Sequence, residues 1–330
     1  VEYDATNYRY HDTLLLQKKD IDTGELIPLA GCEFQIKDEV EELVSLKVEG
    51  ETEKTETFVT DKDGTVYFDE KIPAGKYTLV EITAPDGYSL ADPVPFEVTG
   101  KEKDSTVTVV MSDKRVTTGI TVEKKDAVSG NAAGAGFTFN IVADENIADP
   151  AGNTYKGFEA NSVVDTITTD EKGVASSSVE LYPGKYHIEE TGVAQNYLND
   201  AENIPFEVVQ KKADDGKWYA EVSGFEKNVI TVKNNPVKRP IQITKTDSES
   251  GNAAGADFTF TITADKVIDG TGNVYKGFEK GSVVDTITTD GRGIATSKDL
   301  YCGTYIIRET VRKQNYVLST KEYPITVSDE

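Results

Sequence analysis

The sequence predicts an all-β protein built as a rod of three tandem β-sandwich domains. Short runs rich in Val, Thr, Ile, Tyr and Phe alternate apolar and polar residues, and turn signals such as DKDG, DEKG and APDGY separate them. No long amphipathic helix pattern is visible, and many short strands with closely spaced turns are typical of sandwiches. The chain has 330 residues, a length that favours two or three domains.

An internal repeat sets the number of domains. The stretch SGNAAGAGFTFNI from Ser129 returns as SGNAAGADFTFTI from Ser250, and LYPGKYHIEET returns as LYCGTYIIRET. The period of about 120 residues is the size of a domain and too long for a solenoid repeat. A looser copy precedes these two. We therefore expect domains at 12–115, 116–236 and 237–330, with 1–11 as a linker or as the closing strand of a preceding or neighbouring domain.

The composition excludes several classes of protein. The formal net charge is −23, with 58 acidic against 35 basic residues, which argues against nucleic acid as a partner. No apolar run reaches the roughly 20 residues needed to insert into a membrane. No signal peptide opens the chain and no sorting signal closes it, so we expect either a processed fragment or an intracellular protein. Cys32 and Cys302 lie at opposite ends of the chain and are expected to be unpaired.

One strand of each repeat continues its apolar face into a glutamate. In GKYHIEET, the side chains of Tyr186, Ile188 and Glu190 fall on one face of the strand. GKYTLVEI places Glu81 in the same way, and GTYIIRET places Glu309. A buried charge is costly without a partner, so three inward glutamates predict three buried partners.

Lysines and amide or carboxyl groups supply those partners. The first strand of each repeat ends its apolar face in a lysine, which is Lys18 in LLLQKKD, Lys124 in ITVEKKD and Lys245 in IQITKTD. The closing strands VTVVMSD and ITVKNN end theirs in Asp113 and Asn234. Each of the first two cores is therefore expected to receive a lysine, a glutamate and an Asn or Asp from three separate strands.

This combination predicts a self-crosslinking reaction. Desolvation lowers the pKa of a lysine and raises that of a glutamate, and a neutral amine is a nucleophile. Attack on the third group forms an isopeptide bond and releases ammonia from Asn or water from Asp. A buried salt bridge is the simpler reading of the lysine and glutamate. The predicted bonds are Lys18–Asp113 and Lys124–Asn234, and the predicted assisting acids are Glu81, Glu190 and Glu309.

The third repeat stops at EYPITVSDE, before any closing strand or acceptor for Lys245. The chain begins with VEYDATN, which alternates like a closing strand, and Asn7 precedes Lys18 by the same 11 positions that separate Asp113 from Lys124. Two explanations remain open. In the first, the sequence is cut from a longer array of repeats at points that do not coincide with the domain boundaries. In the second, the opening strand of one molecule completes the third domain of the next, and Asn7 bonds Lys245 of its neighbour.

At these residues the chain resembles the CnaB-type, prealbumin-like domains of Gram-positive pilins and surface adhesins. The shared motifs are KKD or KTD in the first strand, LAGCEF or AAGAGF after it, GKYTLVEITAPDGY late in the domain and a final ITVKNN. The resemblance covers essentially the whole chain. It implies an inverse immunoglobulin-like sandwich and autocatalytic isopeptide bonds at the triads named above. The later repeats depart from the motif because ETGVAQNY and ETVRKQNY lack the pair Ala84-Pro85.

The resemblance implies a structural role at the cell surface. We expect an extracellular, cell-wall anchored stalk or pilus-shaft protein whose partners are other copies or other pilin subunits; sortase and the cell wall are implied by the family only. The alternative is an adhesin that binds a host matrix protein or glycan through its sandwich surface. No turnover enzyme, cofactor or metal site is expected, since HIEE lacks the second histidine of a zinc motif and TDKDG lacks the downstream glutamate of a calcium loop.

Overall fold

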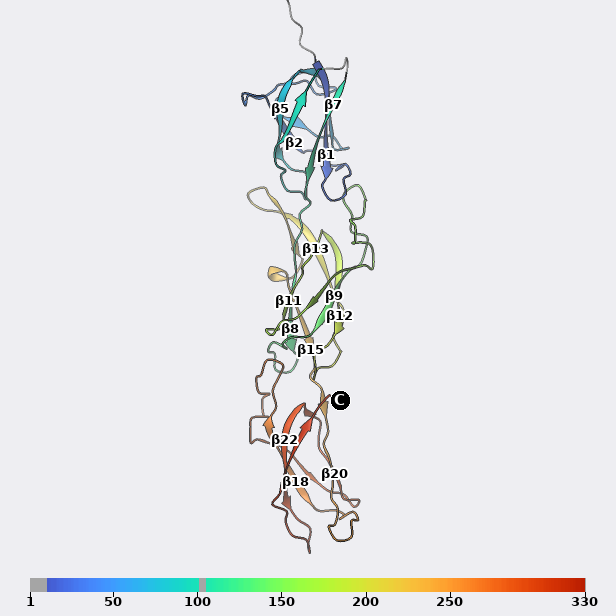
Figure 1. The fold of residues 1–330 in the computed structure, drawn as a ribbon, viewed down its shortest axis with the longest axis vertical. Helices are drawn as coiled ribbons and strands as arrows, with labels where there is room; N and C mark the ends of the chain where they lie inside the picture. The colour runs from blue at the N-terminus through green and yellow to red at the C-terminus, as the bar shows by residue number, and fades with distance from the viewer. Residues whose placement is uncertain (1–10, 101–104, 330) are drawn as a thin grey trace, which may run out of the picture.

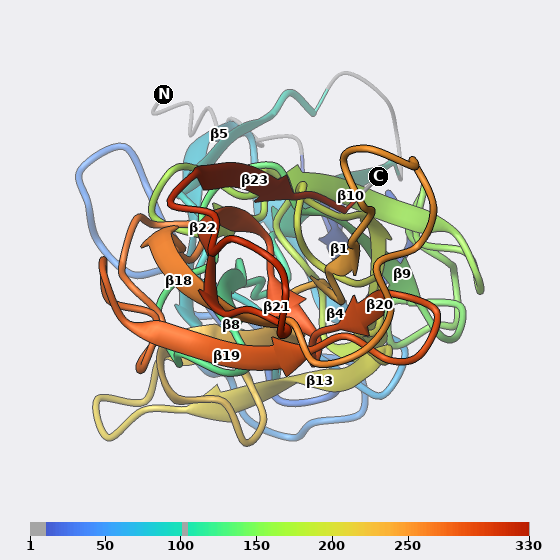
Figure 2. The same ribbon diagram turned by 90° about the horizontal axis from the view of Figure 1, so that it is seen from below.

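The protein is a rod of three β-sandwiches stacked end to end, as the computed structural model shows for residues 11–100 and 105–329 (Figure 1). Viewed along the rod in Figure 2, the strands of the three sandwiches surround one common axis. The predicted all-β architecture is confirmed. The helix in the described residues is the single 3-10 turn η1 (Glu226–Asn228), and no helix there is long and apolar enough to cross a membrane.

The first sandwich packs a three-stranded sheet against a four-stranded sheet. In the smaller sheet, with the order β4-β1-β7, the last strand β7 runs parallel to the first strand β1. Leu14 and Leu16 point from β1 toward Phe34 and Ile36 of the facing sheet, and all four are buried in one apolar cluster. The strands are β1 (His11–Asp20), β2 (Glu33–Lys37), β3 (Phe58–Val59), β4 (Thr65–Pro73), β5 (Gly75–Thr83), β6 (Val94–Val98) and β7 (Thr106–Asp113).

The second sandwich repeats this plan with a larger second sheet. Its small sheet has the order β11-β8-β15, again with the first and last strands parallel, and its large sheet has the order β10-β9-β12-β13-β14. A separate apolar cluster fills the space between them. The strands are β8 (Thr121–Asp126), β9 (Thr138–Ala143), β10 (Val163–Thr168), β11 (Val174–Ser176), β12 (Gly184–Gly192), β13 (Ile204–Lys212), β14 (Trp218–Val222) and β15 (Val229–Asn234).

The third sandwich has a complete large sheet and a reduced small layer. The large sheet has the order β19-β18-β22-β23, and the other layer consists of the pairs β17-β20 and β16-β21. Its apolar cluster is distinct from those of the other two sandwiches. The strands are β16 (Lys238–Arg239), β17 (Gln242–Thr244), β18 (Thr259–Lys266), β19 (Val283–Thr288), β20 (Ile294–Thr296), β21 (Leu300–Tyr301), β22 (Gly303–Val311) and β23 (Glu322–Val327). The predicted opening strand with Asn7 lies outside the described residues.

Buried aspartates tie neighbouring sandwiches together. Asp20, at the end of β1, is fully buried, and its Oδ2 accepts hydrogen bonds from the Tyr88 hydroxyl at 2.8 Å and from the Tyr155 hydroxyl at 2.7 Å. Tyr88 belongs to the first sandwich and Tyr155 to the second. Thr23 adds a second link between the two sandwiches, because its hydroxyl donates to Asp149 at 2.8 Å. The carboxyl group of Asp20 is thus shared across the joint.

The joint between the second and third sandwiches has the same construction. Asp126, at the end of β8, accepts from Tyr197 of its own sandwich at 3.1 Å and from Tyr275 of the next at 2.6 Å. Ser129 and Asn131 both donate to Asp269 of the third sandwich. Because hydrogen bonds restrict the rotation of each sandwich against the next, the two joints should stiffen the rod.

The Tyr275→Phe variant is expected to loosen the second joint. The change removes one hydroxyl donor from a buried carboxyl group, which should cost about 1–3 kcal/mol of unfolding free energy. Small-angle scattering should then show a broader spread of molecular lengths. The matched control is Tyr219→Phe, because Tyr219 is 41% exposed. Equal unfolding midpoints and scattering curves for the two variants would contradict a stiffening role for this hydrogen bond.

Candidate functional site

A lysine, a glutamate and an aspartate meet in the core of the first sandwich. Lys18 lies on β1, Glu81 on β5 of the facing sheet and Asp113 at the end of β7. The Lys18 Nζ atom lies 2.5 Å from Glu81 Oε1 and contacts Asp113 Oδ1 directly. Each of the three side chains is at most 1% exposed. The structure therefore brings the predicted residues together in a site that excludes water.

Neighbouring groups hold the glutamate in place. The Cys32 thiol lies 3.1 Å from Glu81 Oε1, and the backbone amide of Ala91 donates to Glu81 Oε2 at 2.7 Å. Burial raises the pKa of the Cys32 thiol, which favours its protonated form. Burial also raises the pKa of Asp113 to about 7; the charge of Lys18 opposes this shift and that of Glu81 adds to it. The protonated form of Asp113 is thus well populated near neutral pH.

The second sandwich contains an equivalent site with an asparagine. Lys124 Nζ lies 2.7 Å from Glu190 Oε1 and contacts Asn234 Oδ1. The Asn234 amide nitrogen donates to Glu190 Oε2 at 2.6 Å and to the Leu198 carbonyl at 2.7 Å. Glu190 therefore touches both the amine and the amide nitrogen. Burial lowers the pKa of Lys124, although its contact with Glu190 works in the opposite direction, so the neutral amine is favoured relative to an exposed lysine.

The parallel pairing of first and last strands explains the equivalence of the two sites. In the first sandwich, Met111 pairs with Lys18 and Asp113 with Asp20. In the second, the corresponding register places Asn234 two positions beyond the partner of Lys124. Because strand side chains alternate between faces, a residue two positions on points into the same core. The register thus brings each acceptor against its lysine.

The described residues of the third sandwich bring together two of the three groups. Lys245 Nζ lies 2.8 Å from Glu309 Oε2, and Glu309 is 1% exposed. The Lys245 side chain is 23% exposed, whereas those of Lys18 and Lys124 are at most 1% exposed. No Asn or Asp side chain bonds to the Lys245 amine within the described residues.

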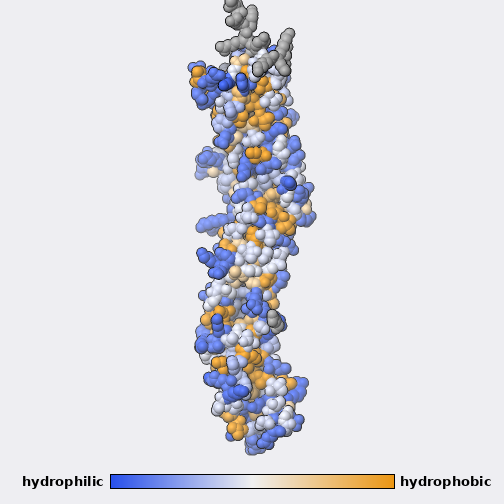
Figure 3. Space-filling model, viewed as in Figure 1, coloured by the Kyte–Doolittle hydropathy of each residue, from blue (hydrophilic) through white to orange (hydrophobic). Residues whose placement is uncertain are grey.

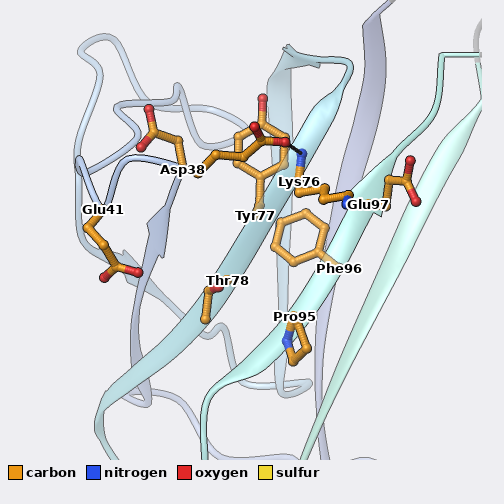
Figure 4. Close-up of a pocket in the computed structure, with 9 residues that line it drawn as sticks. Asp38, Glu41, Lys76, Tyr77, Thr78, Pro95, Phe96 and Glu97 are labelled. Atoms are coloured by element: carbon orange, nitrogen blue, oxygen red, sulfur yellow. Dashed lines mark hydrogen bonds between the residues drawn. The ribbon is translucent and has the colours of Figure 1, made fainter.

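Two surface hollows lie apart from these three sites. An open hollow of about 440 Å³ lies on the first sandwich, where Tyr77 and Phe96 stack and Asp38, Glu41 and Glu97 are among the lining residues (Figure 4). A second hollow of about 500 Å³ lies between the first two sandwiches, where Leu90 and Trp218 line it together with charged residues such as Lys212 and Asp215. Among residues 11–100 and 105–329, no group of three or more His, Cys, Asp and Glu side chains could hold a metal ion.

Sequence reasoning missed the groups that surround the predicted residues. Cys32 was expected only to be unpaired; it is free, but its contact with Glu81 was not foreseen. The tyrosines of the joints were also missed, although Tyr155 and Tyr275 recur within the repeated motif YKGF. That recurrence is the signal that could have pointed to a shared role.

Comparisons with known proteins agree on the fold. The family model described as the SpaA prealbumin-like fold domain matches residues 12–115, 118–221 and 239–330. The structure of the Bacillus anthracis TIE protein is similar, with a TM-score of 0.53 and 24% identity over 96% of this chain, which spans 48% of that structure. No curated protein sequence matches the chain.

Two pilin structures are also similar at low identity. The major pilin subunit BcpA of Bacillus cereus is 15% identical, with a TM-score of 0.32, and the match covers 97% of this chain and 96% of that one. The shaft pilin SpaA of Lactobacillus rhamnosus GG is 15% identical, with a TM-score of 0.27, over 69% of this chain and 98% of that one. At such identities, similarity between structures concerns the fold alone.

Proposed function

This chain belongs to the family of SpaA prealbumin-like fold domains, and from that premise we propose that it is a structural stalk or pilus-shaft protein strengthened by isopeptide bonds. The observation that supports this most is the recurrence of one buried triad in two sandwiches. Burying three polar groups away from solvent costs stability, so the recurrence of the same set favours a role beyond that of an ion pair.

We propose the following reaction for the second sandwich. The neutral Lys124 amine attacks the side-chain carbonyl carbon of Asn234, a carbon–nitrogen bond forms, and the bond from that carbon to the amide nitrogen breaks. Glu190 takes a proton from the attacking amine and gives one to the departing nitrogen, which leaves as ammonia. The contacts of Glu190 with both nitrogens support this role.

The first sandwich would react in the same way with a carboxyl acceptor. Lys18 attacks the carboxyl carbon of protonated Asp113, and the hydroxyl group leaves as water with a proton passed on by Glu81. The raised pKa of Asp113 supports this step, because a neutral carboxylic acid accepts a nucleophile more readily than a carboxylate. Each triad reacts once, so the protein is not a turnover enzyme.

Peptide mapping tests both bonds. Trypsin digestion of the denatured chain should yield a single branched peptide that contains Lys124 and Asn234, and another that contains Lys18 and Asp113. Trypsin should fail to cleave after the two bonded lysines, because their amines have become amides. The adjacent Lys125 provides the control within the same peptide and should be cleaved normally. Recovery of linear peptides that end at Lys124 would exclude the second bond.

The same proposal includes the limits of the domains, the location of the protein and its partners. We place the domains at residues 12–115, 116–236 and 237–330, and the protein outside the cell, anchored to a Gram-positive cell wall. Sortase as the attaching enzyme and other pilin subunits as partners follow from the family resemblance.

An adhesin is the second candidate. The hollow near Trp218 favours it, since this aromatic ring and the 54% exposed Leu90 lie on the surface between two sandwiches. Elsewhere, the face in Figure 3 shows apolar residues only in small groups among polar ones, which suits a stalk better. Binding of the chain to matrix proteins or to a glycan array, lost in the Trp218→Ala variant, would favour the adhesin; no binding would disfavour it.

A further inference from the structure

Cys32 occupies a position that holds a phenylalanine in the other two sandwiches. In each sandwich the backbone amide at this position donates to a threonine hydroxyl at 3.1 Å; the pairs are Cys32–Thr60, Phe137–Thr169 and Phe258–Thr289. Two positions further on, each sandwich has a phenylalanine that pairs with its core glutamate; these pairs are Phe34–Glu81, Phe139–Glu190 and Phe260–Glu309. The backbone is thus the same, and a thiol replaces an aromatic ring beside the first triad.

The ring and the thiol contact different members of the triad. The centre of the Phe137 ring lies 4.8 Å from the Lys124 amine, so the aromatic side chain packs against the lysine. The Cys32 Sγ atom instead lies 3.1 Å from Glu81 Oε1. Cys32 is fully buried, and burial raises the pKa of its thiol, so the sulfur keeps its hydrogen and donates it to the glutamate.

Glu81 is surrounded by hydrogen-bond donors. Its Oε1 contacts both the Lys18 amine, at 2.5 Å, and the Cys32 thiol, and its Oε2 accepts from the backbone amide of Ala91 at 2.7 Å. In the second sandwich, Glu190 Oε1 contacts Lys124 and has no hydrogen-bond partner beyond it within the described residues. Because donors stabilise a charged acceptor, the surroundings of Glu81 favour its carboxylate form.

The acceptor of the first sandwich also differs from that of the second. Asp113 can gain or lose a proton, whereas the amide of Asn234 stays neutral. Two carboxyl groups that share a buried site resist being ionised together, so Glu81 and Asp113 share a proton. The buried Oδ2 of Asp113 has no hydrogen-bond partner among residues 11–100 and 105–329, and burial raises the pKa of Asp113 to about 7. Both observations favour a proton on Asp113.

We propose that the Cys32 thiol is a positioning residue for the reaction of the first sandwich, because its hydrogen bond to Glu81 keeps the shared proton on Asp113. This inference rests on the isopeptide chemistry proposed above. The place of the proton matters because an amine attacks a neutral carboxyl group more readily than a carboxylate. A site with an asparagine acceptor has no such proton to place, and in that site the equivalent residue is Phe137.

The thiol is not consumed by the reaction. Lys18 Nζ forms a bond to the carboxyl carbon of Asp113, and the bond from that carbon to the hydroxyl oxygen breaks. The Glu81 carboxylate accepts a proton from the amine and passes it to the hydroxyl group, which leaves as water. Glu81 ends as a carboxylate and Cys32 as a thiol, so the step needs no oxidant and no further reactant.

Timed peptide mapping tests the role of the thiol. The full chain is sampled at intervals from a cell-free synthesis reaction and denatured at once, and trypsin then releases the branched peptide that joins Lys18 to residue 113. The Cys32→Ala variant should form this bond about threefold to tenfold more slowly, because it loses a weak donor to a charged group. The Cys32→Ser variant should recover most of the rate, since its hydroxyl group also donates.

The Val98→Ala variant is the matched control for a shortened core side chain. Val98 is buried in the same sandwich and pairs with Gly75 at the start of β5, whereas Glu81 lies near the end of that strand. This variant should form the bond at the rate of the parent chain. Slowing equal to that of Cys32→Ala would overturn the inference, because any loss of packing would then have the same effect.

The Asp113→Asn background separates proton placement from packing. An amide acceptor has no carboxyl proton to place, so Cys32→Ala should slow the bond in the parent chain and not in this background. Equal slowing in both backgrounds, or none in the parent chain, would overturn the inference and leave the proposed function intact. Absence of the branched peptide from the parent chain would instead contradict the proposed function, and the inference with it.

Discussion

The Glu190→Gln variant is expected to lack the Lys124–Asn234 bond and to unfold at a much lower temperature. Glutamine keeps the shape of the side chain but cannot take up and return a proton. The proposed bond would close a loop of 110 residues, and a crosslink across a loop of this length restricts the unfolded chain by about 4–5 kcal/mol. For a domain of this size, that loss should lower the thermal midpoint by roughly 20 °C, measured by calorimetry.

The neighbouring Glu189→Gln variant is the matched control. Glu189 precedes Glu190 on β12 and points to the opposite face of the sheet, so this change removes the same charge without touching the triad. It should leave both the bond and the thermal midpoint unchanged. A Glu190→Gln variant that still loses ammonia and melts like the parent chain would show that the glutamate does not assist the reaction.

When the chain is pulled at its two ends, a sandwich that contains an isopeptide bond should not unfold and lengthen. Force enters each of the first two sandwiches at its first strand and leaves at its last, and these strands lie side by side in parallel. A covalent bond between Lys18 and Asp113 would transmit that force directly from β1 to β7, so the residues between them in sequence would not be pulled apart. In the Lys18→Arg variant, those 95 residues become free to unfold, and at about 3.3–3.6 Å per residue they should add roughly 300 Å of length.

Single-molecule force measurements can detect this difference. The Lys19→Arg variant is the control, because Lys19 is the next residue on β1 and its side chain points away from the buried triad. It should show the same number of unfolding steps as the parent chain, whereas Lys18→Arg should show one more. An additional step of this length in the parent chain itself would mean that the first sandwich is held only by hydrogen bonds and an ion pair.

The alternation of side chains made the core positions predictable. The faces that end in Lys18, Lys124 and Glu190 were expected from a period of two, and these side chains are buried in the structure. The repeat then supplied what one copy could not, because the same three residue types recurred at matching places. The alternation of side chains along each strand, together with the sequence repeat, was thus sufficient to predict which residues meet in the triads.

Contacts between distant parts of the chain could not be foreseen in this way. Tyr155 and Asp20 are 135 residues apart, and Tyr275 and Asp126 are 149 apart. Their meeting depends on how one sandwich is set on the next, which no local pattern encodes. The same holds for Cys32, whose contact with Glu81 depends on the pairing of β2 with β5.

The intact mass of the purified chain under denaturing conditions tests the central claim most directly. Two isopeptide bonds, Lys18–Asp113 and Lys124–Asn234, predict a mass below that of the sequence by one water and one ammonia. Glu81→Gln should restore only the water, and Glu190→Gln only the ammonia. A mass equal to that of the sequence would contradict the account, because the triads would then be ion pairs and the rod would have no covalent reinforcement.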